Sequence, residues 1–292
     1  MIEQTDLMKL LESYKIDYKK VMTDKVLDKG EYFGIKHVLE YLVNELKIYP
    51  KNIEKCPSIL YLNVNEVRKN YEFLKQQKIN ISDVETCLHV LSTDNKDLKE
   101  TYYYVLENYG LMTINRITSI LRCNKDRIIN IEKYGLSKDV TISASISRRT
   151  IYEIEKIIKV CKKYNIEITG SVFLKKSSSL QKTIDFIIEN YDERYLTPLI
   201  IIKEPKHLSE VMPYLDSLGV LEFIINSASI LTLTKEEIEK RVEIIKLLGE
   251  DIVKNGKFNS VFGMNKTRLN KKLNSYKDND VIYPLIEDYI VK

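Results

Sequence analysis

The sequence predicts an all-α protein built from a helical repeat, and three observations carry that prediction. First, one hydrophobic template recurs about every 30 residues, which is typical of helical repeat arrays. Second, glycine (9) and proline (6) are scarce among 292 residues, whereas all-β and doubly wound α/β folds need many turns. Third, Thr234 and Glu237 have the spacing of a capping box, which marks a helix start.

The template consists of an apolar anchor followed seven positions later by the first residue of an apolar helical stripe. It occurs at Leu60/Val67, Leu91/Leu98, Leu121/Ile128, Ala144/Ile151, Phe173/Leu180, Ile201/Leu208, Leu231/Ile238 and Phe262/Leu269. Successive anchors are 31, 30, 23, 29, 28, 30 and 31 residues apart. In the third and fourth copies, Glu132 and Glu155 stand where the stripe expects an apolar residue. We expect about eight repeats, each with a long helix, a tight turn and a shorter helix.

The ends of the chain differ from the repeat. Residues 1–50 are expected to form two or three helices as an N-terminal cap or degenerate repeat, residues 51–275 the repeat array, and residues 276–292 a C-terminal cap. Terminal units of an array must present a polar outer face, so they depart from the consensus. No linker rich in Ser, Gly or Pro divides the chain. One continuous α-solenoid is therefore expected.

Local signals place the helix boundaries. Apolar runs such as 199–202 recur with the repeat, so we interpret them as buried helix segments rather than strands. Glycines follow several long stripes, where a left-handed residue commonly ends a helix. These expected caps are Gly110, Gly135, Gly219 and Gly249.

Composition indicates a soluble, folded protein, because 44% of residues are hydrophobic and 30% are charged. The N-terminal residues lack the features of a signal or transit peptide, and no apolar run approaches the ~18 residues of a membrane span. The four cysteines, at positions 56, 87, 123 and 161, form no C-x-x-C pair, so buried thiols are expected. These features predict a cytoplasmic protein without a membrane partner.

The search for catalytic motifs predicts no enzyme, no cofactor and no metal site. His37, His89 and His207 are isolated and show no metal-ligand spacing. There is no Gly-rich phosphate loop and no G-x-S-x-G. Cys87 and His89 are close in sequence, and we expect both to pack in the core.

Basic residues gather at the turns that lead into the long helices. Net charge is only +4, but residues 101–150 hold eight Lys/Arg against four Asp/Glu, and residues 201–250 hold six against nine. Cations beside free helix-start amides on successive repeats suggest a track for phosphate groups. The alternative is that these are solvated turns with Ser, Thr and Asn as ordinary helix caps. The candidate phosphate contacts are Arg122, Lys125, Arg127, Arg148, Arg149, Lys175, Lys176, Lys203, Lys206, Lys266 and Arg268.

Tyrosines offer a second type of nucleic-acid contact, because aromatic rings stack on bases. The candidates are Tyr71 and the run Tyr102-Tyr103-Tyr104. Tyr71 and Tyr102 fall on the apolar stripe, so core packing is the favoured role for both.

The repeat resembles that of the mitochondrial transcription termination factor (mTERF) family. The resemblance covers about residues 50–275 and rests on PSILYLNVNEVRKNYEFL (57–74), PLIIIKEPKHLSEVMPYLDSLG (198–219) and SILTLTKEEIEKRVEIIKLLG (229–249). It implies a right-handed α-solenoid of three-helix repeats, curved so that a concave basic face binds duplex DNA or RNA without a cofactor. Members of the family act in organelle transcription, translation or RNA maturation.

This chain departs from the family pattern in three respects. Only Pro57 and Pro198 keep the family's proline before the anchor, there is no transit peptide, and the overall basicity is low. Either a non-mitochondrial relative or convergence on a similar solenoid fits these departures. The favoured function is nucleic-acid binding by a monomer that regulates transcription or RNA processing. The alternative is a protein-binding scaffold, motivated by the acidic excess in residues 201–250.

Overall fold

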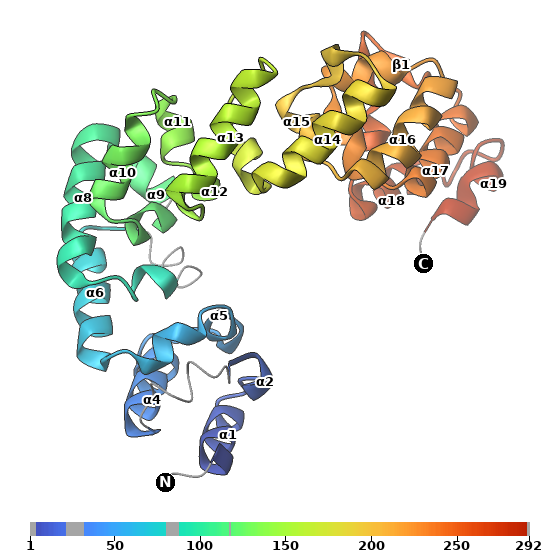
Figure 1. The fold of residues 1–292 in the computed structure, drawn as a ribbon. Helices are drawn as coiled ribbons and strands as arrows, with labels where there is room; N and C mark the ends of the chain where they lie inside the picture. Colours follow the sequence, from blue (N-terminus) through green and yellow to red (C-terminus); the bar gives the residue numbers. More distant parts are fainter. Residues whose placement is uncertain (1–3, 22–31, 80–87, 117, 291–292) are drawn as a thin grey trace. The chain divides into compact units, whose positions relative to one another are not determined.

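The described residues fold mostly into helices (Figure 1), as the sequence predicted. The computed structural model describes residues 4–21, 32–79, 88–116 and 118–290. Two compact units divide the chain, residues 1–149 and residues 150–292. The expected cap boundaries at residues 50 and 275 stay predictions. No helix among the described residues is both long enough and apolar enough to cross a membrane.

Unit 1 contains short and long helices in alternation. Their bounds are α1 (Gln4–Ser13), α2 (Tyr18–Val21), α4 (Tyr32–Leu39), the π-helical η1 (Glu40–Glu45), α5 (Pro50–Lys55), η2 (Pro57–Tyr61), α6 (Val64–Gln76), η3 (Leu88–Val90), α8 (Asn95–Tyr109), α9 (Leu111–Arg116), η4 (Thr118–Arg122), α10 (Lys125–Glu132), α11 (Lys138–Thr141) and α12 (Ala144–Ser147).

Unit 2 follows the same alternation. It contains α13 (Ile151–Lys163), η5 (Gly170–Leu174), α14 (Ser177–Asn190), η6 (Glu193–Tyr195), α15 (Pro198–Ile201), α16 (Pro205–Ser217), η7 (Leu221–Ile225), η8 (Ala228–Thr232), α17 (Lys235–Leu247), β1 (Val253–Lys254), β2 (Lys257–Phe258), η9 (Ser260–Gly263), α18 (Lys266–Asn274), α19 (Tyr283–Ile286) and η10 (Glu287–Tyr289). The run at 199–202 lies mostly in α15, so its helical interpretation is confirmed.

The antiparallel hairpin β1–β2 was not predicted. Val253 pairs with Phe258, and Lys254 pairs with Lys257. Between the strands, Asn255 and Gly256 have φ angles of 53° and 69°, the backbone that the Asn-Gly dipeptide favours in a two-residue hairpin turn. That dipeptide is the sequence signal that reveals the hairpin.

Each anchor lies at a short helix that leads, through an N-cap residue, into a long helix; we call this element a turn–helix pair. The N-cap lies three residues after the anchor, as Asn63 does after Leu60 and Thr234 after Leu231. Except at 144/151, every anchor is at most 5% exposed and its partner seven residues later is fully buried, apart from the half-buried Leu269. All four expected glycine caps have a positive φ. The apolar template therefore identified the core-facing positions.

The fourth copy was assigned to the wrong residues. Ala144 and Ile151 are both only half-buried, and the N-cap of α13 is Thr150. Counting back three residues places the anchor at Ser147 (6% exposed) and its partner at Ile154 (0%). Because Ser147 is polar, it hid the correct position. With this correction, Glu155 no longer falls on the apolar stripe.

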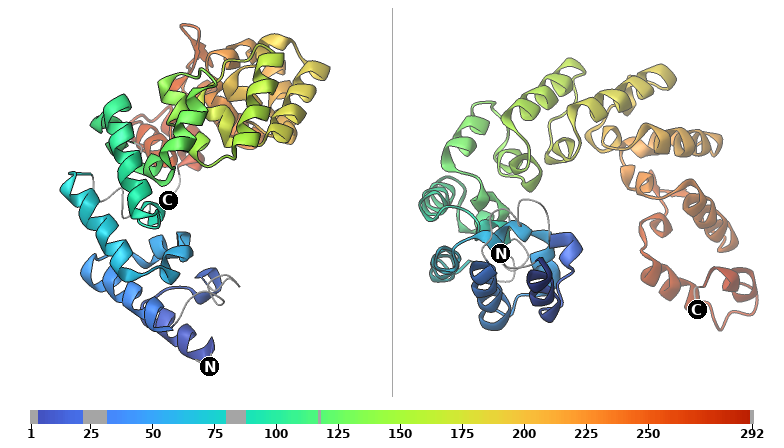
Figure 2. Two further views of the ribbon diagram at one scale, coloured as in Figure 1. Left: turned by 60° about the vertical axis from the view of Figure 1, so that its left-hand side comes forward. Right: turned by 60° about the horizontal axis from the view of Figure 1, so that its bottom comes forward.

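Long helices pack beside long helices, and short beside short, within each unit. In unit 1, α6 contacts α4 and α8, and α8 contacts α10, while η3 packs against η4 and η4 against α12. In unit 2, α14 packs between α13 and α16, and α16 against α17. The short helices η5, α15, η8 and η9 form a second row. Figures 1 and 2 show the long helices of each unit in three orientations.

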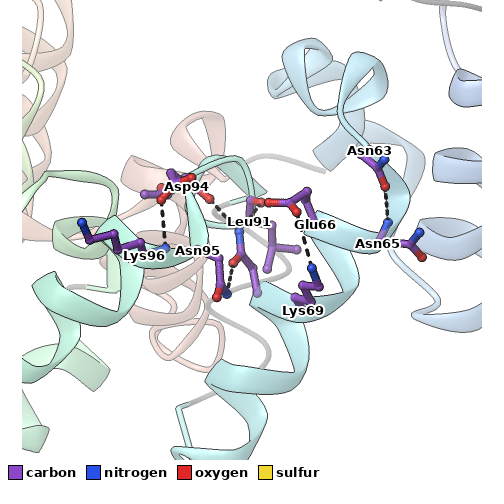
Figure 3. A network of polar contacts seen from close by, with 10 residues as sticks. Asn63, Asn65, Glu66, Lys69, Leu91, Asp94, Asn95 and Lys96 are labelled. Atoms are coloured by element: carbon purple, nitrogen blue, oxygen red, sulfur yellow. Dashed lines mark hydrogen bonds and ion pairs between the residues drawn. The ribbon is translucent and has the colours of Figure 1, made fainter.

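Polar side chains of the long helices bond to the backbone within or just after the next short helix, and we call these bonds junction contacts. In unit 1, Asn70 Nδ2 donates to the carbonyls of Leu91 (3.0 Å) and Thr93 (2.7 Å). Figure 3 shows this junction, where Asn95 Nδ2 in turn donates to the oxygen of Asn70 (2.8 Å). Thr101 Oγ1 donates to the Cys123 carbonyl, 2.8 Å away.

Unit 2 repeats the arrangement. Thr183 Oγ1 donates to the Lys203 carbonyl (2.9 Å), and Arg241 Nη1 donates to the carbonyls of Val261 and Phe262. The last carbonyls of a helical turn have no partner within that turn. A buried carbonyl left without one costs about 1–3 kcal/mol. The junction contacts thus stabilise the stacking of one pair on the next.

The junction contact comes from one of two positions on the long helix. Asn70, Thr101, Thr183 and Arg241 lie ten residues after their anchors. Where that position is apolar, the residue four earlier, on the same helix face, supplies the polar group. These residues are Arg127, which donates to Arg149 and Ile146, Glu153, which accepts from the Ser177 amide, and His207, which bonds the Leu231 carbonyl.

Candidate nucleic-acid interface

The stacked short helices bring cations from successive turn–helix pairs into neighbouring positions. In unit 1, Arg122 ends η4 and Arg148 directly follows α12, which packs against η4. In unit 2, η5 packs against α15. Lys175 directly follows η5, and Lys203 lies two residues beyond α15. Arg122 and Arg148 are 26 positions apart in the sequence, and Lys175 and Lys203 are 28 apart, yet each pair belongs to adjacent turns of its unit.

The unit 1 cluster contains a histidine that the sequence did not single out as a site residue. Arg122 and Arg148 are exposed, and His89 in η3 is partly buried. Burial lowers the pKa of His89, and the positive charges of Arg122 and Arg148 lower it further. The three side chains thus act on one another electrostatically.

Cys56 holds the ring of His89. Its Sγ lies 3.2 Å from His89 Nδ1, with the hydroxyls of Ser58 and Ser92 at 3.7 and 4.0 Å from the same sulfur. Cys87, which we expected to pack in the core, lies outside the described part of the chain. Cys56 lies four residues before the anchor Leu60, and His89 lies two residues before the anchor Leu91.

Lysines form the corresponding cluster in unit 2. Burial lowers the pKa of Lys203, and the nearby charge of Lys175 lowers it further. Lys175 also forms an ion pair with Glu204, the N-cap residue of α16. Lys176 and Lys206 are exposed.

Arg127 has a structural role. Its guanidinium makes the junction contact to Arg149 and Ile146, and its Nε is buried without a hydrogen-bond partner among the described residues. The Arg149 side chain is half-buried. Hydrogen bonding to the backbone leaves the Arg127 guanidinium fewer donors for a phosphate.

The remaining candidates occupy mixed surroundings. Lys125 Nζ lies 5.9 Å from the centroid of the Tyr104 ring. Lys266 and Arg268 are exposed in the first turn of α18. Lys266 borders a hollow of about 410 Å³ that is also lined by Glu237 and Asp288.

Helix-start amides are largely satisfied by the protein itself. The side chains of Asn124, Thr150, Thr234 and Asn265 accept hydrogen bonds from backbone amides as N-caps. Glu153 accepts from the first amide of α14. For these residues the capping role is the observed one. A phosphate at these turns would meet cations rather than free amides.

The tyrosines divide into core and surface residues. Tyr71 (9% exposed) and Tyr102 (2%) are buried, as expected, whereas Tyr103 is exposed. The hydroxyls of Tyr104 and Tyr109 each donate to Glu132, both at 2.5 Å. Burial and this hydrogen bond raise the pKa of Tyr104 to about 12. Glu132, the polar residue on the stripe of the third copy, therefore accepts hydrogen bonds from two tyrosine hydroxyls.

Metal-ligating side chains do not cluster in the described part of the chain, where no group of three His, Cys, Asp or Glu residues has a suitable arrangement. Cys56, Cys123 and Cys161 are buried. Comparisons with models of protein families, with characterised proteins and with solved structures found no match to this chain.

Proposed function

We propose that this protein is a nucleic-acid-binding α-solenoid that holds DNA or RNA through phosphate contacts. The observation that carries the proposal is the placement of cations at the ends of stacked short helices in both units. Burial lowers the pKa values of His89 and Lys203, and repulsion by the neighbouring positive charges lowers them further. A polyanion would relieve this repulsion and release counterions at the same time.

The contacts favoured by their exposure are Arg122, Arg148, Lys176, Lys206, Lys266 and Arg268. Lys203 is added as a half-buried member. Arg127 and Lys175 contribute less, because the backbone and Glu204 already engage them.

The finer features of the architecture form part of the same proposal. We propose about eight repeats in a right-handed, mTERF-like superhelix with a basic concave face. Recurrence of turn–helix pairs and of junction contacts supports a repeat array. A role in transcription or RNA processing, as a monomer without cofactor or enzymatic activity, follows from the resemblance in sequence.

Fluorescence anisotropy with labelled duplex DNA, single-stranded DNA and structured RNA tests the proposal. Binding at micromolar concentration or tighter, weakening steeply between two salt concentrations, is the expected result. The nucleic acid that binds most tightly identifies the substrate class. An absence of binding to all three at low salt would refute the proposal.

A matched pair of variants separates the basic turns from general surface charge. Replacing Arg122, Arg148, Lys176 and Lys206 with Gln removes four proposed contacts, and should reduce the salt slope by about 3 to 4 for duplex DNA. The control carries the same number of Gln substitutions at exposed lysines elsewhere on the long helices: Lys75, Lys162, Lys182 and Lys271. Equal losses in the two variants would contradict specific contacts at the turns.

A protein-binding scaffold is the second candidate. The observation that favours it is the acidic surface of residues 201–250, where Glu204, Glu210, Asp216 and Glu222 are exposed. Such a surface repels nucleic acid and suits a basic polypeptide. Purification free of nucleic acid, together with a stoichiometric polypeptide that Glu→Gln changes at these sites release, would support this function.

A further inference from the structure

We propose that His89, Arg122 and Arg148 form a single phosphate-binding site in unit 1. The proposal deepens the proposed function, because it adds His89 to the interface and names the group bound. It makes a separate claim, however, since the site would accept an isolated phosphate ion as well as a nucleic acid.

The geometry rests on three consecutive short segments of unit 1. His89 is the middle residue of η3, Arg122 the last residue of η4, and Arg148 the residue after α12. Because η3 packs against η4 and η4 against α12, these residues lie at adjoining turns. The two arginines are exposed, which leaves their guanidinium groups accessible to a ligand.

Cys56 prepares His89 for this role. Sγ lies 3.2 Å from Nδ1, and the proposal takes the tautomer in which the thiol donates to Nδ1 and the ring carries its own proton on Nε2. The neutral imidazole therefore offers an N–H donor from Nε2. Through this contact, Cys56 also fixes the orientation of the ring, as a partner on one imidazole nitrogen does generally.

The charges favour a phosphate over a neutral ligand. Arg122 and Arg148 oppose protonation of His89 in the free protein, and their effect adds to burial. A bound anion reverses the electrostatic part of this effect, so that phosphate and proton bind cooperatively. Among the described residues, the groups that act on His89 are the Cys56 thiol, between α5 and η2, and the two guanidinium groups. Guanidinium forks match phosphate oxygens, and an imidazolium adds a third charge-assisted donor.

Phosphate reaches such a site from two chemical sources. One is a phosphodiester within a nucleic-acid backbone, and the other is a terminal phosphate monoester. The same three donors recognise both, so the experiment includes a thymidine decamer with and without a 5′-phosphate, beside inorganic phosphate alone.

Histidine NMR on the full-length protein measures the site directly. The pKa of His89 is followed with and without inorganic phosphate, with assignment from the His89→Gln spectrum. We expect phosphate to raise this pKa and to leave the ring resonances of the other two histidines, His37 and His207, in place. The Arg122→Gln/Arg148→Gln variant should bind phosphate on the order of tenfold more weakly. Lys162→Gln/Lys182→Gln, with the same charge change at exposed positions of unit 2, should leave binding at His89 unchanged.

The outcomes separate this inference from the proposed function. If the wild-type pKa of His89 does not respond to phosphate or to either decamer, the site is refuted, even where anisotropy shows nucleic-acid binding. If phosphate raises the pKa but no nucleic acid binds, the site stands and the proposed function fails. A response to the 5′-phosphorylated decamer alone identifies a terminal-phosphate site, whereas equal responses identify backbone contacts.

Discussion

Asn70 makes the best-defined junction contact, and its replacement tests how turn–helix pairs are held together. The side chain is fully buried, and its amide donates to the carbonyls of Leu91 and Thr93. Thr occupies the equivalent position in α8 and α14, where it donates a single bond. The informative substitutions are therefore Asn70→Thr, which keeps one donor, and Asn70→Val, whose side chain has the shape of Thr but no donor.

The magnitude follows from the carbonyls left without a partner. Each buried carbonyl that loses its donor costs about 1–3 kcal/mol. The Leu91 carbonyl bond is fully buried and the Thr93 bond partly so, so Asn70→Val should lower the free energy of unfolding by about 3 kcal/mol. Asn70→Thr should recover about 1 kcal/mol of that loss, because its hydroxyl bonds one carbonyl. Val and Thr have similar helix propensity, so the difference reports the hydrogen bond.

Urea unfolding followed by far-ultraviolet circular dichroism measures these free energies. Two units raise the prospect of two transitions, so the earlier and later transitions are fitted separately. Asn65→Ala, at an exposed position of the same helix, is the control and should change stability by less than about 0.5 kcal/mol. Equal stabilities of the Thr and Val variants would refute the hydrogen-bonding role assigned to this position.

Three further predictions address single side chains. Arg127→Lys should destabilise the protein by about 2 kcal/mol in urea unfolding, because lysine lacks the planar fork that bonds backbone carbonyls; stability within 0.5 kcal/mol of wild type would contradict this. The folded protein holds the pKa of His89 below its ordinary 6.5, so the unfolded chain binds more protons between the two pKa values. The contribution of His89 to the free energy of unfolding is therefore present above pH 6.5 and is lost as the pH falls through the pKa that His89 has in the folded protein. Urea unfolding of the wild type and of His89→Gln at several pH values checks this prediction. Glu132→Gln should lower the pKa of Tyr104 from about 12, since it removes a carboxylate that disfavours the phenolate, and an unchanged ultraviolet titration would refute this.

Much of the fold was accessible from the sequence, because apolar spacing reports burial directly. Leu60 and Val67 illustrate the predicted pairs that are fully buried. The prediction failed for the fourth copy because Ser147 at the anchor is polar and gives no hydrophobic signal, although its side chain is only 6% exposed. The hairpin at Asn255-Gly256 was missed because two residues per strand leave no periodicity to detect.

The candidate site was less accessible. The sequence located the basic turns but did not reveal which cations the protein itself engages. Arg127 and Arg122 have the same charge and lie five residues apart, yet only Arg127 is on the helix face that meets the next turn. His89 was overlooked because its partners, Cys56, Arg122 and Arg148, are all more than 30 residues away in sequence. Such combinations depend on how the short helices stack.

The junction contacts have a direction that matters when the chain emerges from the ribosome. Each one runs from a long helix to the turn that follows it in sequence, as from Thr183 to Lys203. Within each unit, a long helix that has already folded therefore presents a polar side chain, a donor in most cases and the Glu153 carboxylate as an acceptor, to the next turn to be synthesised. The turn–helix pair that folded last is then the one whose junction contact has still to form. The unit can then grow one pair at a time, and little unpaired polar surface is exposed to aggregation during translation.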